Sequence, residues 1–176
     1  MSQLELSQFL QEHQLGRDYT QQTADYFAPL ARELTNLHQN KKQTIIVGVN
    51  GAQGSGKSTL SELLVELFEK QYDLNAVTLS LDDFYYTHSE RQHLAHNVHP
   101  LFSTRGVPGT HDVLLAHETL DQLLNHNGAQ TIHIPRFNKA TDDRYEASQW
   151  SPIKHKPDII ILEGWCIGAC AQNEPQ

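Results

Sequence analysis

Cysteines and long apolar runs are scarce in this chain of 176 residues, and both absences exclude classes of protein. Cys166 and Cys170 are the two cysteines, too few for a disulfide framework, and their C-x3-C spacing matches neither a zinc knuckle nor a redox pair. We therefore expect a reduced, cytoplasmic protein. The apolar runs are too short to span a bilayer, and the N-terminal residues lack the basic start and apolar centre of a signal peptide.

Positive charge is also in short supply. Lys and Arg total 13 against 21 Asp and Glu, which gives a formal net charge of −8. Binding to nucleic acid or to an anionic membrane needs a positive field over a whole face, so we expect neither partner. Hydrophobic residues make up 38% of the chain, which is too many for disorder and enough for the core of one ordinary domain.

Hydrophobic periodicity divides the chain into an N-terminal helical segment at 1–42 and a core at 43–176. A helical stripe is predicted in the first segment at Phe27, Leu30, Ala31, Leu34 and Leu37. The core is expected to contain strands at 45–49, 76–81, 131–134 and 158–162 and helices at 60–68 and 114–124. Residues 84–109 are expected to form a long functional loop with short helical pieces. The β-branched run at 45–49 predicts a strand buried on both faces. This alternation is typical of an α/β domain with a parallel sheet.

The last predicted strand lies close to Gln176. Four strands can form a sheet, but one edge would then have no covering helix. We therefore expect a core that lacks later elements at its C-terminal side.

A glycine-rich turn joins the first core strand to the following helix. It satisfies the pattern G-x-x-x-x-G-K-[ST], and its residues are predicted to bind ATP: Gly51, Ala52, Gln53, Gly54, Ser55, Gly56, Lys57, Ser58 and Thr59. The glycines let the backbone approach phosphates closely, and the helix N-terminus faces the anion. Lys57 is expected to reach the β- and γ-phosphates, and the Ser58 hydroxyl to ligate Mg²⁺.

Two adjacent carboxylates, Asp82 and Asp83, follow the second core strand. An acceptor hydroxyl that attacks the γ-phosphate must lose its proton, and a carboxylate at this edge of the sheet is a natural base. Two neighbouring acids cannot both point into one cleft, so one of them is expected to cap the turn. We assign Asp82 as the catalytic base and Asp83 as mainly structural. Lys57 is the second residue that we assign to the catalytic site.

A third acid, Glu163, ends the last predicted strand. A carboxylate there can hold Mg²⁺ directly or through water, whereas the alternative is an ordinary acidic turn. A GTPase would carry D-x-x-G at this point and N-K-x-D later, and neither occurs. A hydrolytic ATPase normally ends this strand in paired acids. The pattern therefore favours a small-molecule kinase.

Basic residues gather in two loops and are candidates for binding an anionic substrate or the transferring phosphoryl group. The alternative for each is a surface salt bridge. The candidates are Arg105 in RGVPGTHD and Arg136, Lys139 and Arg144 in IPRFNKATDDR.

The motifs GVNGAQGSGKST, SLDDFYYT, RGVPGTHD, IPRFNKATDDR and ILEGW together resemble the plant-type D-glycerate 3-kinases and their bacterial and fungal relatives. These belong to the phosphoribulokinase, uridine kinase and pantothenate kinase group. The resemblance extends over about residues 44–168. It implies the P-loop containing nucleoside triphosphate hydrolase fold, a three-layer α/β/α arrangement around a parallel sheet. Such kinases continue past the ILEGW strand with a lid and further strands.

Carried over by position, the resemblance implies that Lys57 and Ser58 bind ATP·Mg²⁺, that Asp82 is the base and that Glu163 lies at the metal. It also implies that the acceptor substrate lies near Arg105, His111 and Asp112.

The sequence therefore predicts an ATP-dependent kinase that phosphorylates a hydroxyl of a small metabolite, with D-glycerate favoured. The alternatives are a kinase of the same group acting on another alcohol, such as uridine, pantothenate or a ribulose phosphate, and a nucleotide-binding module without transfer activity. The oligomeric state is left open.

Overall fold

The computed structural model describes residues 1–170, which form two compact units. The first unit comprises Met1–Thr78 together with the chain from Asp158 onward, and the second comprises Leu79–Pro157. The predicted boundary between residues 42 and 43 does not coincide with this division and stays a prediction.

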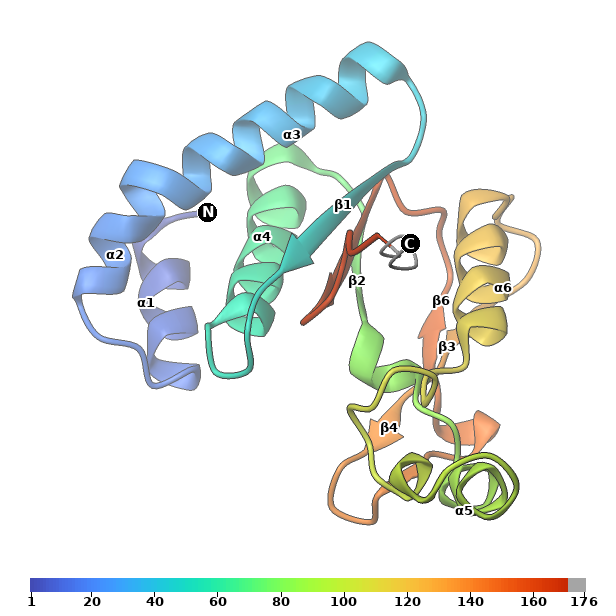
Figure 1. Cartoon of the computed structure of the whole chain (residues 1–176). Helices are drawn as coiled ribbons and strands as arrows, with labels where there is room; N and C mark the ends of the chain where they lie inside the picture. The colour runs from blue at the N-terminus through green and yellow to red at the C-terminus, as the bar shows by residue number, and fades with distance from the viewer. Residues whose placement is uncertain (171–176) are drawn as a thin grey trace, which may run out of the picture. The chain divides into compact units, whose positions relative to one another are not determined.

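A parallel sheet organises the first unit. Its strands are β1 (Ile45–Asn50), β2 (Ala76–Ser80), which leads into the second unit, and β7 (Ile159–Gly164), in the order β1-β7-β2. β1 and β7 pair in parallel from Ile45 opposite Ile159 to Asn50 opposite Gly164. The helices are α1 (Gln3–Glu12), α2 (Asp18–Gln22), the π-helical turn η1 (Thr23–Phe27), α3 (Ala28–Lys41) and α4 (Lys57–Tyr72) (Figure 1). The predicted parallel sheet and N-terminal helices are confirmed.

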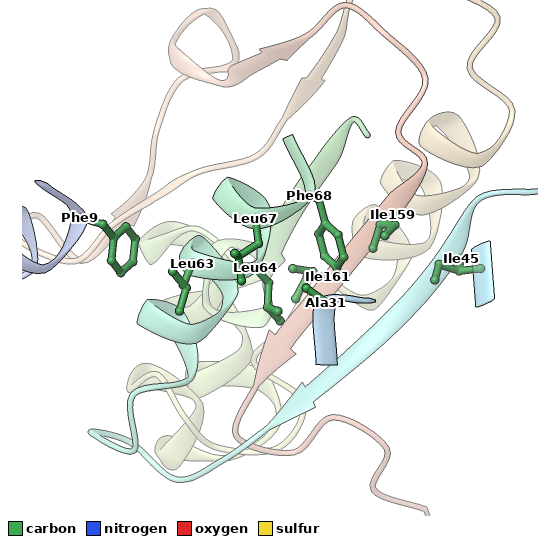
Figure 2. Close-up of a cluster of buried hydrophobic side chains, with 9 residues drawn as sticks. All are labelled: Phe9, Ala31, Ile45, Leu63, Leu64, Leu67, Phe68, Ile159 and Ile161. Carbon is green, nitrogen blue, oxygen red and sulfur yellow. The ribbon is translucent and has the colours of Figure 1, made fainter. Parts of the chain in front are cut away.

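The core of this unit lies where α4 packs on β1 and β7. Its buried side chains are Phe9, Ala31, Ile45, Leu63, Leu64, Leu67, Phe68, Ile159 and Ile161 (Figure 2). The four from α4 recur at helical spacing and therefore share one face of the helix. Each fully buried side chain of this size contributes about 1.5–3 kcal/mol. This packing fixes the start of α4 beside the ends of the strands, where the P-loop lies.

Two details of the predicted burial are wrong. β1 is buried on one face alone, because the core contacts Ile45, Val47 and Val49 while Ile46 on the other face is 46% exposed. β7 is the strand whose residues are buried on both faces. On α3, the predicted stripe members Leu30 and Leu37 are 40% and 42% exposed. Ala31 of the predicted stripe is buried and Leu34 packs against the core, as expected, while Thr35, which was not in the stripe, is buried as well.

The second unit is built from short elements. Its helices are the 3₁₀ turns η2 (Leu81–Phe84), η3 (Pro100–Ser103) and η4 (Ala147–Gln149), and the α-helices α5 (His88–Asn97) and α6 (Val113–Leu124). Its strands are β3 (Ile132–Ile134), β4 (Phe137–Asn138), β5 (Asp143–Arg144) and β6 (Ser151–Ile153). β3 pairs with β6, and β4 with β5, both antiparallel. The strand predicted at 131–134 therefore forms, but it is not part of the parallel sheet.

The segment expected to be a long loop with short helical pieces contains a regular helix of 10 residues, α5. α5 begins with a capping box, in which the Thr87 hydroxyl accepts a hydrogen bond from the Glu90 amide and the Glu90 carboxylate accepts one from the Thr87 amide. The T-x-x-E pattern that signals this box is present in the sequence. Within residues 1–170, no helix combines the length and the apolar character that crossing a membrane requires.

Candidate active site

The P-loop occupies residues 51–56 as the turn between β1 and α4 (Figure 1). Gly54 and Gly56 adopt positive φ angles of 76° and 83°, a region that side chains rarely occupy. A Cβ at either glycine would meet no atom within 4 Å, so both face open space. The Gly51 amide donates to the Gly164 carbonyl at 3.2 Å, which ties the loop to the end of β7. The loop thus has the open backbone that phosphate binding requires.

Three predicted residues come together beside this loop. The Ser58 hydroxyl donates to Glu163 Oε1 at 3.1 Å, and Lys57 Nζ lies 3.8 Å from Glu163 Oε2. The side chain of Glu163 is 5% exposed, and its Oε2 has no hydrogen-bond partner in the described part of the chain. A buried carboxylate oxygen without a donor is costly, which a bound cation would relieve.

This arrangement fits a magnesium ion that arrives with ATP. Mg²⁺ is usually held by one or two carboxylates together with substrate phosphates and water, rather than by an all-protein cage. Residues 1–170 contain no group of three or more His, Cys, Asp or Glu placed to hold a metal. Glu163 and Ser58 are the side chains that would contribute oxygens.

The two adjacent acids of the second unit have different surroundings. Asp83 accepts hydrogen bonds from Arg136 Nη1 at 2.8 Å and from the Phe137 amide at 3.0 Å, and its side chain is 14% exposed. Asp82 contacts Lys139 Nζ at 2.7 Å and is 34% exposed. Asp83 therefore joins η2 to β4, while Asp82 keeps oxygen atoms open to a ligand.

The RGVPGTHD segment is held against the residues that follow Asp83. The Asp112 amide donates to the Phe84 carbonyl at 2.7 Å, and the Tyr86 amide donates to the Thr110 carbonyl at 2.9 Å. The His111 ring stacks on Tyr85 with 4.1 Å between the centroids. Backbone pairing thus brings together two motifs that are 25 residues apart in the sequence.

His111 is partly buried beside Tyr85. Burial lowers the pKa of its imidazole below the ordinary value, and the nearby Asp82 carboxylate opposes that shift. Its Nε2 is buried and has no hydrogen-bond partner among residues 1–170. Burial therefore favours the neutral imidazole, and the Asp82 carboxylate lies close enough to favour the protonated form to a smaller extent.

Several predicted substrate residues have partners within the protein. Arg144 donates to the Tyr85 carbonyl and pairs with Asp112 at 3.3 Å. Asp112 caps α6 by accepting from the Leu115 amide at 3.0 Å. Arg136 bonds Ser151 as well as Asp83. These contacts give the three side chains structural roles, and their contact with substrate stays a prediction.

Two residues of this unit were not singled out in the sequence. Arg91 is fully buried and donates to three backbone carbonyls. Asp142, between β4 and β5, pairs with both Arg91 and Arg105. A charged residue in a polar helix carries no sequence signal of burial, so tertiary structure alone reveals Arg91.

Residues 46–169 match the model of the phosphoribulokinase / uridine kinase family. The chain belongs to this family. Family membership confirms the predicted resemblance and the nucleotide-binding P-loop kinase fold, with a parallel sheet flanked by helices. P-loop kinases in general use ATP together with a divalent metal ion.

Individual family members are similar over most of this chain. It is 40% identical over 131 residues to the uncharacterized kinase mug58 of Schizosaccharomyces pombe, covering 70% of this chain and 46% of that protein. It is 35% identical to the chloroplastic D-glycerate 3-kinase of Arabidopsis thaliana, covering 70% of this chain and 28% of that protein. The structure of a D-glycerate 3-kinase from Cryptococcus neoformans matches with a TM-score of 0.69 and 31% identity, over 87% of this chain and 54% of that one. This chain therefore spans about half the length of such relatives, or less.

Proposed function

We propose that this chain forms the core of an ATP-dependent kinase that phosphorylates a hydroxyl of D-glycerate. The observation that carries the proposal is the contrast between the two adjacent acids. Asp83 is bonded to Arg136 and to backbone, whereas Asp82 is one-third exposed and is contacted by the exposed side chain of Lys139. A partly exposed carboxylate at the end of a strand is suited to accept a proton.

In this proposal the first unit binds the donor. The P-loop amides and Lys57 bind the phosphates of ATP, and Lys57 offsets negative charge on the γ-phosphoryl group as it is transferred. Ser58 and Glu163 hold Mg²⁺, which neutralises charge on the phosphate oxygens when it is bound.

The second unit binds the acceptor. Asp82 accepts the proton of the acceptor hydroxyl as the oxygen forms its bond to the γ-phosphorus, the bond to the ADP oxygen breaks and ADP leaves. Lys139, Arg105 and His111 surround the acceptor in this proposal, and Arg136, Asp112 and Arg144 support the loops around it. D-glycerate is favoured because proteins named D-glycerate 3-kinase are among the relatives in both sequence and structure.

Another acceptor is the second candidate. The family model takes its name from phosphoribulokinase and uridine kinase, whose acceptors also carry hydroxyl groups. Such an alcohol would need the same base at Asp82 and different contacts around it. A nucleotide-binding module without transfer activity is the third candidate, and it predicts ATP binding without product.

The test measures ADP release with Mg·ATP, with and without D-glycerate, for the unmodified chain and for Asp82→Asn. The variant should keep ATP binding and lose glycerate-dependent release by about 10²- to 10⁴-fold, the usual contribution of a general base. Asp121→Asn on the exposed face of α6 is the matched control and should have no effect. Undiminished transfer by Asp82→Asn would eliminate the assignment of the base.

We propose the cytoplasm as the location. Cys166 and Cys170 are both free thiols, in keeping with a reducing compartment.

A further inference from the structure

A buried arginine holds three segments of the second unit together. Arg91 on α5 is fully buried, and its guanidinium donates to the carbonyls of Tyr86 at 3.1 Å, Ser103 at 3.0 Å and Asp142 at 2.6 Å. Each carbonyl belongs to a different segment. The position of the guanidinium is therefore determined by the backbone rather than by solvent.

Asp142 connects this fixed arginine to a second one. Its Oδ2 lies 2.9 Å from Arg91 Nη2, and its Oδ1 lies 2.7 Å from Arg105 Nε. Asp142 adopts a positive φ of 55°, which aspartate tolerates better than most residues. Because one oxygen is bound to a fixed partner, the other presents a fixed negative charge to Arg105.

The Arg105 guanidinium has contacts on two sides, and its two terminal nitrogens are available to donate hydrogen bonds to a ligand. Asp142 pairs with its Nε, and the centre of its guanidinium lies 5.1 Å from the centroid of the Phe137 ring. Within residues 1–170, its two terminal nitrogens have no protein acceptor. Its side chain is 29% exposed, so these nitrogens remain accessible. The outer edge of the guanidinium is thus a positioned pair of donors.

Arg136 and Arg144 each use a terminal nitrogen to bond a protein group. Arg144 bonds the Tyr85 carbonyl through Nε and Nη2 and pairs with Asp112. Arg136 bonds Ser151 through Nε and Asp83 through Nη1. Both side chains hold protein groups in place through a terminal nitrogen, whereas neither terminal nitrogen of Arg105 has a protein acceptor within residues 1–170. Arg105 is therefore the arginine best placed to bind an external anion through both terminal nitrogens.

The candidate base lies in the same cluster. Phe137, under the Arg105 guanidinium, donates its amide to Asp83 and contacts the Tyr85 ring edge-on at 5.6 Å. Lys139, two residues further along the hairpin, contacts Asp82. An anionic group bound at Arg105 would therefore belong to a ligand of the Asp82 site.

We propose that Asp142 is a positioning residue that orients Arg105 to bind the carboxylate of the acceptor. The inference rests on the proposed function, because it takes D-glycerate as the acceptor. A planar pair of guanidinium donors matches the two oxygens of a carboxylate, and fixing that pair before binding lowers the entropy lost when the ligand arrives. Asp142 acts through Arg105 and does not touch the acceptor.

The first measurement tests the positioning without any substrate. Arginine Nε–H signals are recorded by ¹H–¹⁵N correlation NMR, and the Arg105 signal is assigned from its loss in Arg105→Lys. In Asp142→Asn that signal should shift and its guanidinium should rotate more freely, while the Arg91 signal persists. Glu118→Gln, at an exposed acid on α6, is the matched control and should leave both signals unchanged.

The second measurement is calorimetric titration with D-glycerate and, separately, with glycerol, which has the hydroxyls but no carboxylate. Arg105→Gln should weaken D-glycerate binding about 10- to 100-fold, and Asp142→Asn about 2- to 10-fold. The double variant should bind within about 2-fold of Arg105→Gln alone, because Asp142 has no role once the guanidinium is gone. Glycerol binding should be equal in all of these proteins.

The titrations distinguish failure of the proposed acceptor from failure of the role given to Asp142 and Arg105. If the unmodified protein does not bind D-glycerate, the proposed acceptor is refuted and this inference with it. If D-glycerate binds and Arg105→Gln leaves its affinity unchanged, this inference alone is refuted. Additive losses in the double variant, or equal losses for glycerol, would show that Asp142 only supports the fold.

Discussion

Replacing Glu163 by glutamine separates its role in the empty protein from its role with bound nucleotide. The change keeps the size of the side chain and the oxygen that accepts from Ser58 at 3.1 Å, and it removes the negative charge 3.8 Å from Lys57 Nζ. We expect little change in the stability of the nucleotide-free protein and a large loss of the stabilisation that Mg·ATP confers.

The small effect on the free protein follows from two opposing energies. At 3.8 Å and an effective dielectric constant of about 20, the attraction is about 4 kcal/mol. Desolvating the two charges costs several kcal/mol for each buried ion. Lys57 is 18% exposed and can turn toward water once its partner is neutral. The variant should therefore lose no more than about 1 kcal/mol of unfolding free energy.

The effect on nucleotide binding is larger. At a Mg·ATP concentration of about 100 times Kd, binding stabilises the protein by about 2.7 kcal/mol. A 10- to 100-fold weaker site reduces that gain to about 1.4–0.4 kcal/mol at the same concentration. For a chain of this length, the melting temperature should rise by about 5–10 °C in the unmodified protein and by about 1–6 °C in Glu163→Gln.

The assay is thermal unfolding with no ligand, with Mg·ATP, and with ATP plus EDTA. Without metal, both proteins should gain the same stability, because Glu163 no longer has an ion to hold. Glu69→Gln, at an exposed acid on α4, is the control and should behave as the unmodified chain. An undiminished Mg·ATP shift in Glu163→Gln would refute the assignment of this residue to the metal, and so would an equal loss in the presence of EDTA.

Two further predictions concern the second unit. Arg91→Met leaves three carbonyls and one carboxylate without their donor, and it should lower the free energy of unfolding by about 3–5 kcal/mol in a urea titration. The exposed Arg32→Met should change it by less than about 0.5 kcal/mol, and a similar small value for Arg91 would contradict its structural role. Burial lowers the pKa of His111, so as the pH falls below the ordinary histidine value the unfolded chain binds a proton first and stability decreases. His111→Asn should reduce the loss in urea midpoint between pH 7.5 and pH 5.5, and an identical loss in both proteins would show that His111 does not contribute.

Local sequence signals predicted the elements around the P-loop correctly. The β-branched run at 45–49, the glycines and the apolar residues of the next helix are periodic patterns over a few neighbouring residues, and such patterns report local structure directly. The same holds for the strand that ends in Glu163. The burial of β1 was predicted less well, because a β-branched run does not reveal how many faces of the strand are covered.

In the second unit, local sequence patterns did not predict the features that depend on contacts between distant segments. β3 had the composition of a strand. Its antiparallel partner β6, in which Ile153 lies opposite Ile132, is further along the chain and carried no comparable signal. The capping box of α5 was visible in the sequence as T-x-x-E. The burial of Arg91 in that helix was not, because it depends on carbonyls supplied by distant segments.

The sequence by itself determined that the chain has a phosphate-binding loop on an α/β core and carries carboxylates at the ends of two strands. Only the tertiary structure decided which side chains remain available for chemistry. Asp82 and Asp83 are adjacent residues of the same type, so the sequence does not distinguish their roles. The same holds for the three loop arginines, Arg105, Arg136 and Arg144. Their differences arise from hydrogen bonds and ion pairs that span up to 59 residues, such as Arg144 with Tyr85 and Lys139 with Asp82. Such contacts depend on how the loops fold against one another, and no local pattern encodes them.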